Sequence, residues 1–315
     1  MQMDGEESSN IEDRRGEGGG GFGGGGFGGL GSGGFGGGGF GGPGLPIPLG
    51  LFRGGFGLIA FFVLMLVLNG GPGALLDGIT GGNSSQVPAQ TRSATRTTAD
   101  DPETQFVSRV LRSTEVVWGD IFQQLGRQYR QPHLVLFRGA TPTACGRGEA
   151  AMGPFYCPPD QRVYIDLSFF DELARRFHAP GQFPQAYVIA HEIGHHVQNL
   201  LGISGKVAQM SGQMSRRDAN ALSVRTELQA DCLAGVWAYH ANQQRGGKMI
   251  GDADVDQALA AAAAIGDDKL QQQAQGRVVP DSFTHGTSEQ RARWFRRGLQ
   301  NGDMNRCDTF RAQSL

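Results

Sequence analysis

A glycine-rich tract near the start of the chain limits how much of it can fold around a core. Residues 16–50 contain 22 of the 52 glycines, interrupted by Phe22, Phe27, Phe35 and Phe40. Glycine supplies no apolar surface and loses the most backbone entropy on ordering. We therefore expect residues 1–53 to form a disordered tail. Residues 101–315 are enough for one well-packed domain, and the chain is too short for a large multidomain assembly.

An apolar run follows the glycine tract. Residues 54–68 carry no charge, and residues 58–68 are apolar on every side of a helix. Extension to residue 76 reaches the length that spans a bilayer, so we predict a transmembrane anchor at 54–76 and a linker at 77–100. A cleaved signal peptide is disfavoured, because the run begins so far into the chain. Arg14, Arg15 and Arg53 precede the run, whereas the other side carries no basic residue before Arg92. We therefore expect a single-pass cell-membrane protein with a cytoplasmic N-terminus and an extracytoplasmic domain.

The charges and cysteines narrow the partners and the compartment. The 28 basic and 30 acidic residues nearly balance, which argues against a nucleic-acid partner. The four cysteines form no CxxC pair, and outside the cytoplasm they permit two disulfides with three pairings. We favour Cys145–Cys157, which closes a short loop, together with Cys232–Cys307. Four free thiols are the alternative.

Hydrophobic periodicity indicates the fold class. Apolar residues recur at steps of three and four between Val107 and Leu125, which predicts an amphipathic helix ending at Gly126. A strand is expected around 134–137. Apolar pairs at 155–156 and 163–165 flank Pro158-Pro159-Asp160, a pattern typical of a hairpin. The rest of the chain is mainly helical in pattern. We predict an α+β fold, mostly helix, with a small antiparallel sheet.

The segment YVIAHEIGHHVQNLL, residues 187–201, has the features of a helix that could hold a metal ion. His191 and His195 are four residues apart, so both imidazoles lie on one helix face and can bind the same ion. Glu192 is then beside the metal rather than bound to it, where it can take a proton from the attacking water. A helix with two buried core histidines is the alternative.

A second helical segment, residues 226–237, offers a third ligand. A catalytic zinc takes three protein ligands and keeps one open position, and two histidines with a glutamate form one of the known sets. Glu227 is the candidate for that glutamate. Asp231 lies one turn further along and could accept the outer N–H of a ligand histidine. Without the histidine helix, these acidic residues would simply be an exposed charged face.

Two further histidines need separate explanations. His196 points about 100° away from His195 around the helix, so we expect it to be a structural, hydrogen-bonded residue. His285 precedes a predicted capping box, Thr287 to Gln290, at the start of a last helix. A histidine in that loop could reach the site and stabilise an oxyanion, or it could be purely structural. We expect Trp294 and Phe295 to lie in the core.

Four blocks, in order, resemble one family. GPFYCPPDQRVYID, AHEIGHHVQNLLG, RTELQADCLAGVWA and FTHGTSEQRARWF stand behind an N-terminal EDRRG and the glycine tract, and together they resemble the bacterial neutral zinc metallopeptidases. The resemblance spans about residues 101–307 and implies a membrane-anchored zinc peptidase with a gluzincin-like core. It implies His191, His195 and Glu227 as zinc ligands and Glu192 as the base. His195 and Glu227 are further apart than in thermolysin-type enzymes, so residues 202–218 are expected to loop out near the cleft as a lid or substrate guide.

These observations predict a zinc endopeptidase that hydrolyses protein or peptide substrates. An edge strand at 155–156 or 163–165 could pair with the extended substrate backbone and give broad specificity. One alternative is a non-catalytic envelope protein whose zinc site is structural and closed by a fourth ligand, for which His285 is the candidate. Another is a hydrolase that cleaves cell-wall amide bonds by the same water chemistry.

Overall fold

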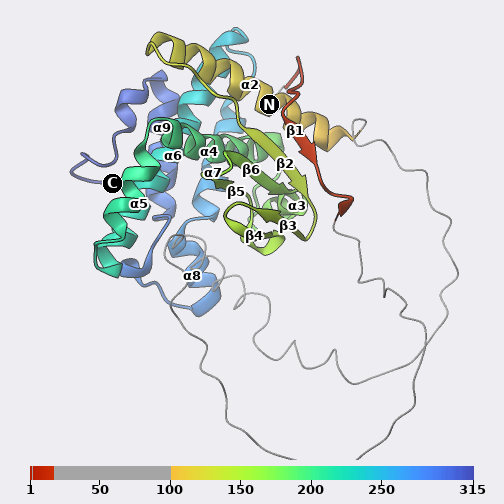
Figure 1. Ribbon diagram of the computed structural model, residues 1–315. Coiled ribbons are helices and arrows are strands. Elements are labelled where there is room, and N and C mark those ends of the chain that lie inside the picture. The colour runs from red at the N-terminus through yellow and green to blue at the C-terminus, as the bar shows by residue number, and fades with distance from the viewer. Residues whose placement is uncertain (2, 18–100) are drawn as a thin grey trace, which may run out of the picture.

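The computed structural model describes residues 1, 3–17 and 101–315, which form a mostly helical α+β fold. Figure 1 shows a small sheet lying against one side of a helical body. The remainder of the expected tail, the expected anchor at 54–76 and the expected linker lie outside the described residues. Among the helices that are described, none is both long enough and apolar enough to cross a bilayer.

The main sheet is mixed rather than antiparallel. Its strand order is β1 (Ile11–Asp13), β2 (His133–Phe137), β6 (Arg162–Asp166) and β5 (Phe155–Cys157). β2 runs parallel to both β1 and β6. Only β5 and β6, the predicted hairpin, pair antiparallel in this sheet. A second antiparallel hairpin, β3 (Ala140–Thr143) and β4 (Gly146–Glu149), interrupts the path between β2 and β5. The predicted antiparallel sheet is therefore wrong for the inner strands, because β5 takes the outer position and β6 returns beside β2 in the same direction.

The N-terminal residues are part of the domain, so the prediction of disorder from residue 1 is wrong for residues 3–17. β1 occupies the open edge of β2, where Leu134 N donates to Asn10 O at 2.9 Å and Arg14 N donates to Leu136 O at 2.7 Å. Asn10 Nδ2 and Ser8 Oγ donate to the Glu115 carboxylate at 2.7 and 2.6 Å. Glu115 is only 3% exposed. The segment lacks hydrophobic periodicity and is held by backbone pairing and by this buried carboxylate instead.

Arg15 joins the two borders of the stretch 18–100. Its Nη1 lies 2.7 Å from Asp101 Oδ2, and its Nη2 donates to Thr104 Oγ1 at 2.8 Å. Arg15 also pairs with Asp13. We call the Arg15–Asp101 contact the clasp. The clasp therefore holds the two described borders, near residues 15 and 101, next to each other.

Long helices make up the body of the domain, and the apolar pattern predicted several of them. The side chains of Trp118, Trp237, Trp294 and Phe295 are each at most 2% exposed, which confirms the predicted core positions of the last two. The helices are α2 (Pro102–Gln124), α3 (Ser168–Arg175), α4 (Gln182–Leu200), α5 (Ile203–Ser211), α6 (Arg216–Gln244), α7 (Asp252–Ala264), α8 (Asp267–Gln275) and α9 (Ser288–Asn301), with short 3₁₀ turns at Ala150–Met152, Pro280–Ser282 and Met304–Cys307.

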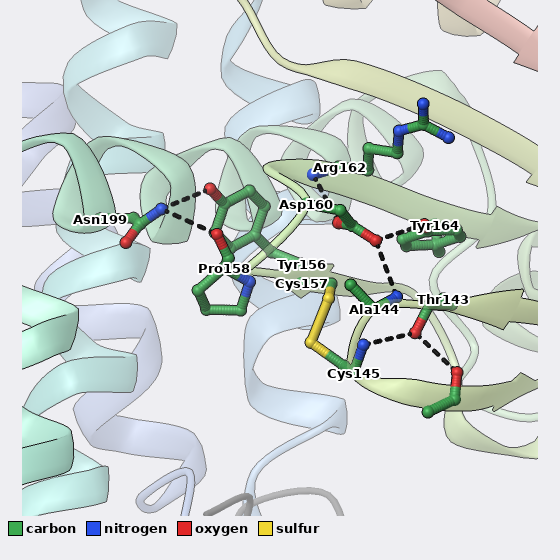
Figure 2. The surroundings of a disulfide bond; sticks show 11 residues. Thr143, Ala144, Cys145, Tyr156, Cys157, Pro158, Asp160, Arg162, Tyr164 and Asn199 are labelled. Atoms are coloured by element: carbon green, nitrogen blue, oxygen red, sulfur yellow. Dashed lines mark hydrogen bonds between the residues drawn. A yellow bond between two sulfur atoms is a disulfide. The ribbon is translucent and has the colours of Figure 1, made fainter.

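Both favoured disulfides are present, which confirms the pairing. Cys145–Cys157 ties the turn between β3 and β4 to β5, and Cys232–Cys307 ties α6 to the final 3₁₀ turn. Figure 2 shows the first bridge and the contacts beyond it. Asn199 of α4 donates to Tyr156 Oη at 2.9 Å and to Pro158 O at 3.3 Å. The end of β5 is thus held on one side by a disulfide and on the other by α4.

Candidate metal centre

The close approach of α4 and α6 creates the site. Gly194, inside the HEIGH segment, faces Ala230, and a Cβ at that glycine would lie only 3.0 Å from the Ala230 carbonyl oxygen. Glycine therefore allows the two helix backbones to come closer than a larger residue would. Glu227 precedes Ala230 by three residues on the same face of α6, so this contact carries Glu227 towards His191 and His195.

The three predicted ligands converge. His191 Nε2 lies 3.2 Å from Glu227 Oε2, and His195 Nε2 lies 3.5 Å from Glu227 Oε1. One donor atom from each of the three side chains lies within 4.8 Å of the others. Ligand atoms about 2.0–2.1 Å from a tetrahedral zinc are roughly 3.3 Å from one another. The spacing and the chemistry of the donors therefore fit one zinc ion.

The outer nitrogens of both imidazoles are hydrogen-bonded. His191 Nδ1 lies 2.8 Å from Asp231 Oδ1, the contact predicted for Asp231. His195 Nδ1 lies 2.9 Å from Gln198 Oε1. Gln198 is fully buried, and its amide nitrogen donates to Thr226 O at 2.8 Å, so its oxygen is turned towards the imidazole. These partners leave each Nε2 facing Glu227. Sequence reasoning missed Gln198, although its position three residues after His195 on the same helix was a usable signal.

Arg291 of α9 completes the polar network behind His191. The fully buried Asp231 accepts from Arg291 Nε and Nη2, both at 2.9 Å, and from Tyr187 Oη at 2.5 Å. Arg291 itself is 3% exposed. Arg291 reaches Asp231 because α6 and α9 cross very closely. At the crossing, Gly235 of α6 and Gly298 of α9 face each other's helix, and a Cβ on either glycine would overlap the backbone of the other helix. Neither Arg291 nor Tyr187 was predicted, because their roles depend on this helix crossing.

The electrostatics of the site favour positive charge at the paired nitrogens. Burial alone would lower the pKa of His191, but the Asp231 and Glu227 carboxylates raise it to about 10. Burial likewise opposes a charged His195, yet Glu227 raises its pKa. Burial would raise the pKa of Glu227, but the two histidines hold it well below its usual range. The same carboxylates would also favour a divalent cation bound between these side chains.

Glu192 and His285 line the same cavity as the ligand histidines. Glu192 is 7% exposed, and burial raises the pKa of its carboxyl group. His285 is positioned by Asp267, whose Oδ1 lies 3.2 Å from the imidazole Nδ1. Asp267 Oδ2 also accepts the backbone N–H of His285 at 2.6 Å. Burial opposes a charged His285, but Asp267 raises its pKa. His285, just ahead of the capping box of α9, therefore lies beside the ligand histidines, which is one of the two alternatives left open for it.

His196 points away from the metal centre. Its Nδ1 lies 3.0 Å from Tyr156 Oη, and its Nε2 lies 2.7 Å from Arg130 O. It is fully buried, and burial lowers the pKa of the imidazole to about 4. The predicted structural role of His196 agrees with these two contacts.

A cavity of about 360 Å³ runs over the metal centre between β5 and α5. Residues 202–218, expected to loop out, form α5 and the start of α6, and α5 contributes Ser204, Val207 and Ala208 to the wall. On the other side, β5 contributes Phe155 and Tyr156. β5 is an edge strand, whereas β6 is paired on both sides. Of the two strands considered for substrate pairing, 155–156 therefore has an edge without a partner strand among the described residues, and 163–165 has none.

Two imidazoles one turn apart, a carboxylate from a second helix and a glutamate beside the first imidazole define the HExxH class of metal-site proteins. The chain belongs to the family described as "Putative neutral zinc metallopeptidase", whose model matches residues 1–310. The chain is similar to the Escherichia coli (strain K12) "Uncharacterized protein YpfJ", with 47% identity over 96% of each chain. It is also similar to the Mycobacterium tuberculosis (strain H37Rv) "Uncharacterized protein Rv2575", with 44% identity over 77% of this chain and 86% of that relative. No solved structure matches the chain.

Proposed function

We propose that this protein is a zinc-dependent endopeptidase that hydrolyses peptide bonds in protein substrates. The observation that carries the proposal is the convergence of His191 Nε2 and His195 Nε2 on Glu227, at 3.2 and 3.5 Å. Each outer nitrogen is held by another side chain, so the two rings are oriented before any ion binds.

Glu192 and His285 would handle the proton and the developing charge. A zinc ion held by the three ligands would supply Lewis acidity, which polarises the scissile carbonyl and lowers the pKa of a nearby water molecule. Glu192 takes the proton from the attacking water and passes it to the leaving amine, a task suited to a carboxylate whose pKa is raised by burial. His285, whose pKa Asp267 raises against the effect of burial, would in its protonated form donate a hydrogen bond to the carbonyl oxygen as negative charge develops.

The edge of β5 would hold the substrate in an extended conformation. Backbone pairing along an open strand gives affinity that depends little on sequence. The Cys145–Cys157 disulfide and the contacts of Asn199 keep this edge fixed relative to α4. A substrate paired there would pass over the metal centre, because both β5 and the ligand histidines line the cavity.

The donor count favours catalysis over a structural metal site. A structural zinc is enclosed by four protein ligands. Within the described part of the chain, the group at this site contains His191, His195 and Glu227. His285, the candidate fourth ligand, is not a member of this group, whose donor atoms all lie within 4.8 Å of one another. A coordination position is therefore left for water and substrate.

The decisive experiment compares Glu192→Gln with the unmodified protein. We expect the variant to retain zinc, measured by elemental analysis, and to lose about 10²- to 10⁴-fold in cleavage of a denatured generic protein. Equal turnover by the two proteins would exclude Glu192 as the base. Cleavage of purified peptidoglycan but not of protein would instead favour the cell-wall amide alternative. Zinc binding without turnover of either substrate would favour the non-catalytic alternative.

We further propose that residues 54–76 attach the enzyme to the membrane and that the folded domain, with residues 11–13 paired into its sheet, lies outside the cytoplasm. The uncharged apolar run supports attachment, and two disulfides suit an oxidising compartment. Deletion of 54–76 should move the protein from the membrane fraction, after carbonate extraction, to the soluble fraction. Retention of the deleted form in membranes would contradict attachment through this segment.

A further inference from the structure

The cavity over the metal centre follows α4, and its two ends are chemically different. Val188 lies almost one turn before His191, and Gln198 lies almost one turn after His195, and all four line the cavity. The contact of Asn199 with Pro158 O places the end of β5 beside the later part of α4. The ligands therefore lie between an end near Val188 and an end near Gln198.

The end near Val188 is apolar. It is lined by Val188 together with Phe169 of α3 and Phe177 just after α3, and we call these three residues the aromatic pocket. The two rings lie 6.4 Å apart between centroids. The three side chains are only 5–6% exposed, so they are packed in place. None of them carries a hydrogen-bonding or charged group.

The other end is mixed in character. There the wall contains Ser204 and Val207 of α5, Thr226 of α6 and Gln198. None of the residues of α5 is buried, and the helix begins after Gly202, which has a left-handed backbone conformation with φ 76°. This end thus offers hydroxyl groups and small side chains where the first end offers aromatic rings.

Two arginines lie near the aromatic pocket. The guanidinium carbon of Arg176 lies 5.4 Å from the centroid of the Phe177 ring, but Arg176 is not among the residues that line the cavity. Arg291 lines the cavity, but its Nε and Nη2 both donate hydrogen bonds to Asp231. A charged substrate side chain entering the aromatic pocket would lose its hydration without gaining a partner. A bulky apolar side chain would bury surface at no such cost.

We propose that the aromatic pocket selects the substrate residue next to the scissile bond, requiring an uncharged, bulky apolar side chain there. The α5 end accepts small or polar side chains. The selection rests on the proposed peptidase function and adds the substrate class to it. We expect a preference of about tenfold or more for Leu, Ile, Met or Phe over Gly or Asp at that one position.

The test makes the same valine-to-phenylalanine change at each end of the cavity and adds a smaller residue at Val188. Full-length protein, Val188→Phe, Val188→Ala and Val207→Phe are each given a proteome-derived peptide library, and cut sites are read by mass spectrometry. Val188→Phe should shift the preferred side chain towards Ala and Gly, and Val188→Ala should shift it towards Phe and Trp. Val207→Phe, the matched change, should leave the preference at that position as it was. Zinc content and melting temperature are measured for every variant.

Each outcome decides between the two proposals. No cleavage by the unmodified protein contradicts the peptidase function itself. Cleavage without an apolar preference on either side of the cut contradicts the aromatic pocket alone. So does a preference that stays unchanged in both Val188 variants, or one that Val207→Phe moves at the same position. If Val188→Phe fails to fold, the enlarged Val188→Ala pocket decides the question through its expected shift to larger residues.

Discussion

The metal-centre helices and the N-terminal strand are held in the same domain by different forces. Behind the metal centre, Asp231 and Arg291 form an ion pair with almost no exposure to solvent. Around β1, many contacts are ion pairs near the surface, such as Glu6 with Arg112 and Glu12 with Arg162. Buried pairs are costly to break, whereas exposed pairs contribute little. The two regions should therefore respond differently to substitution and to pH.

The largest effect is expected at the buried pair. Arg291→Leu leaves the Asp231 carboxylate buried without its cation, so we expect a loss of about 3–5 kcal/mol in the free energy of unfolding. Zinc affinity should fall as well, because Asp231 orients His191. Chemical denaturation and a zinc titration measure the two effects. Arg291→Lys is the matched control and should lose less, since it keeps the charge but not both parallel bonds.

The pH dependence should have opposite signs in the two regions. After zinc removal, His191 has a pKa raised from 6.5 to about 10 by Asp231 and Glu227, against burial. Its contribution to stability is complete below pH 6.5 and is lost as the pH rises towards 10. The clasp behaves oppositely, because the hydrogen bond from Arg15 holds the pKa of Asp101 below 3.8. Its contribution is present above pH 3.8 and is lost in acid.

Melting curves of the zinc-free protein across this pH range measure the alkaline effect, and Arg15→Gln isolates the acid one. A zinc-free protein whose melting temperature is flat between pH 6.5 and 10 would contradict the first expectation. For the second, Arg15→Gln should destabilise the protein at pH 7 and have less effect as the pH falls below 3.8.

A smaller loss is expected at the N-terminal strand. Asn10→Ala removes one donor from the buried Glu115 carboxylate, so we expect a loss of about 1–3 kcal/mol with zinc content unchanged. Glu6→Ala is the control and should cost about 0.5 kcal/mol or less, because the Glu6 side chain is 81% exposed. Urea titrations of both variants measure the difference. Equal effects would mean that β1 is held by surface charge and not by Glu115.

The difference between these regions also explains which parts of the fold and of the site could be predicted from the sequence. His191, Glu192 and His195 lie within one helix, and Glu227 and Asp231 lie within another. The spacing inside each helix was therefore enough to predict which of these side chains share a helix face. β1 has three residues and no apolar alternation, and its partner strand begins at His133, far along the chain. Arg291 reaches Asp231 only through the close contact of Gly235 and Gly298. Such long-range contacts leave no periodic pattern in the sequence.

The clasp limits which side of a membrane the two described parts of the chain can face. Because β1 is hydrogen-bonded to β2 and Arg15 to Asp101, residues 3–17 and 101–315 must share one compartment. A polypeptide that traversed a bilayer once between these borders would separate them. Cysteines introduced at Glu6 and Arg175, both 81% exposed, should therefore react alike with an impermeant maleimide in intact cells, relative to the parent protein. Unequal labelling would mean that the N-terminal strand and residues 101–315 face different sides of the membrane, and that the chain between them crosses the bilayer an odd number of times.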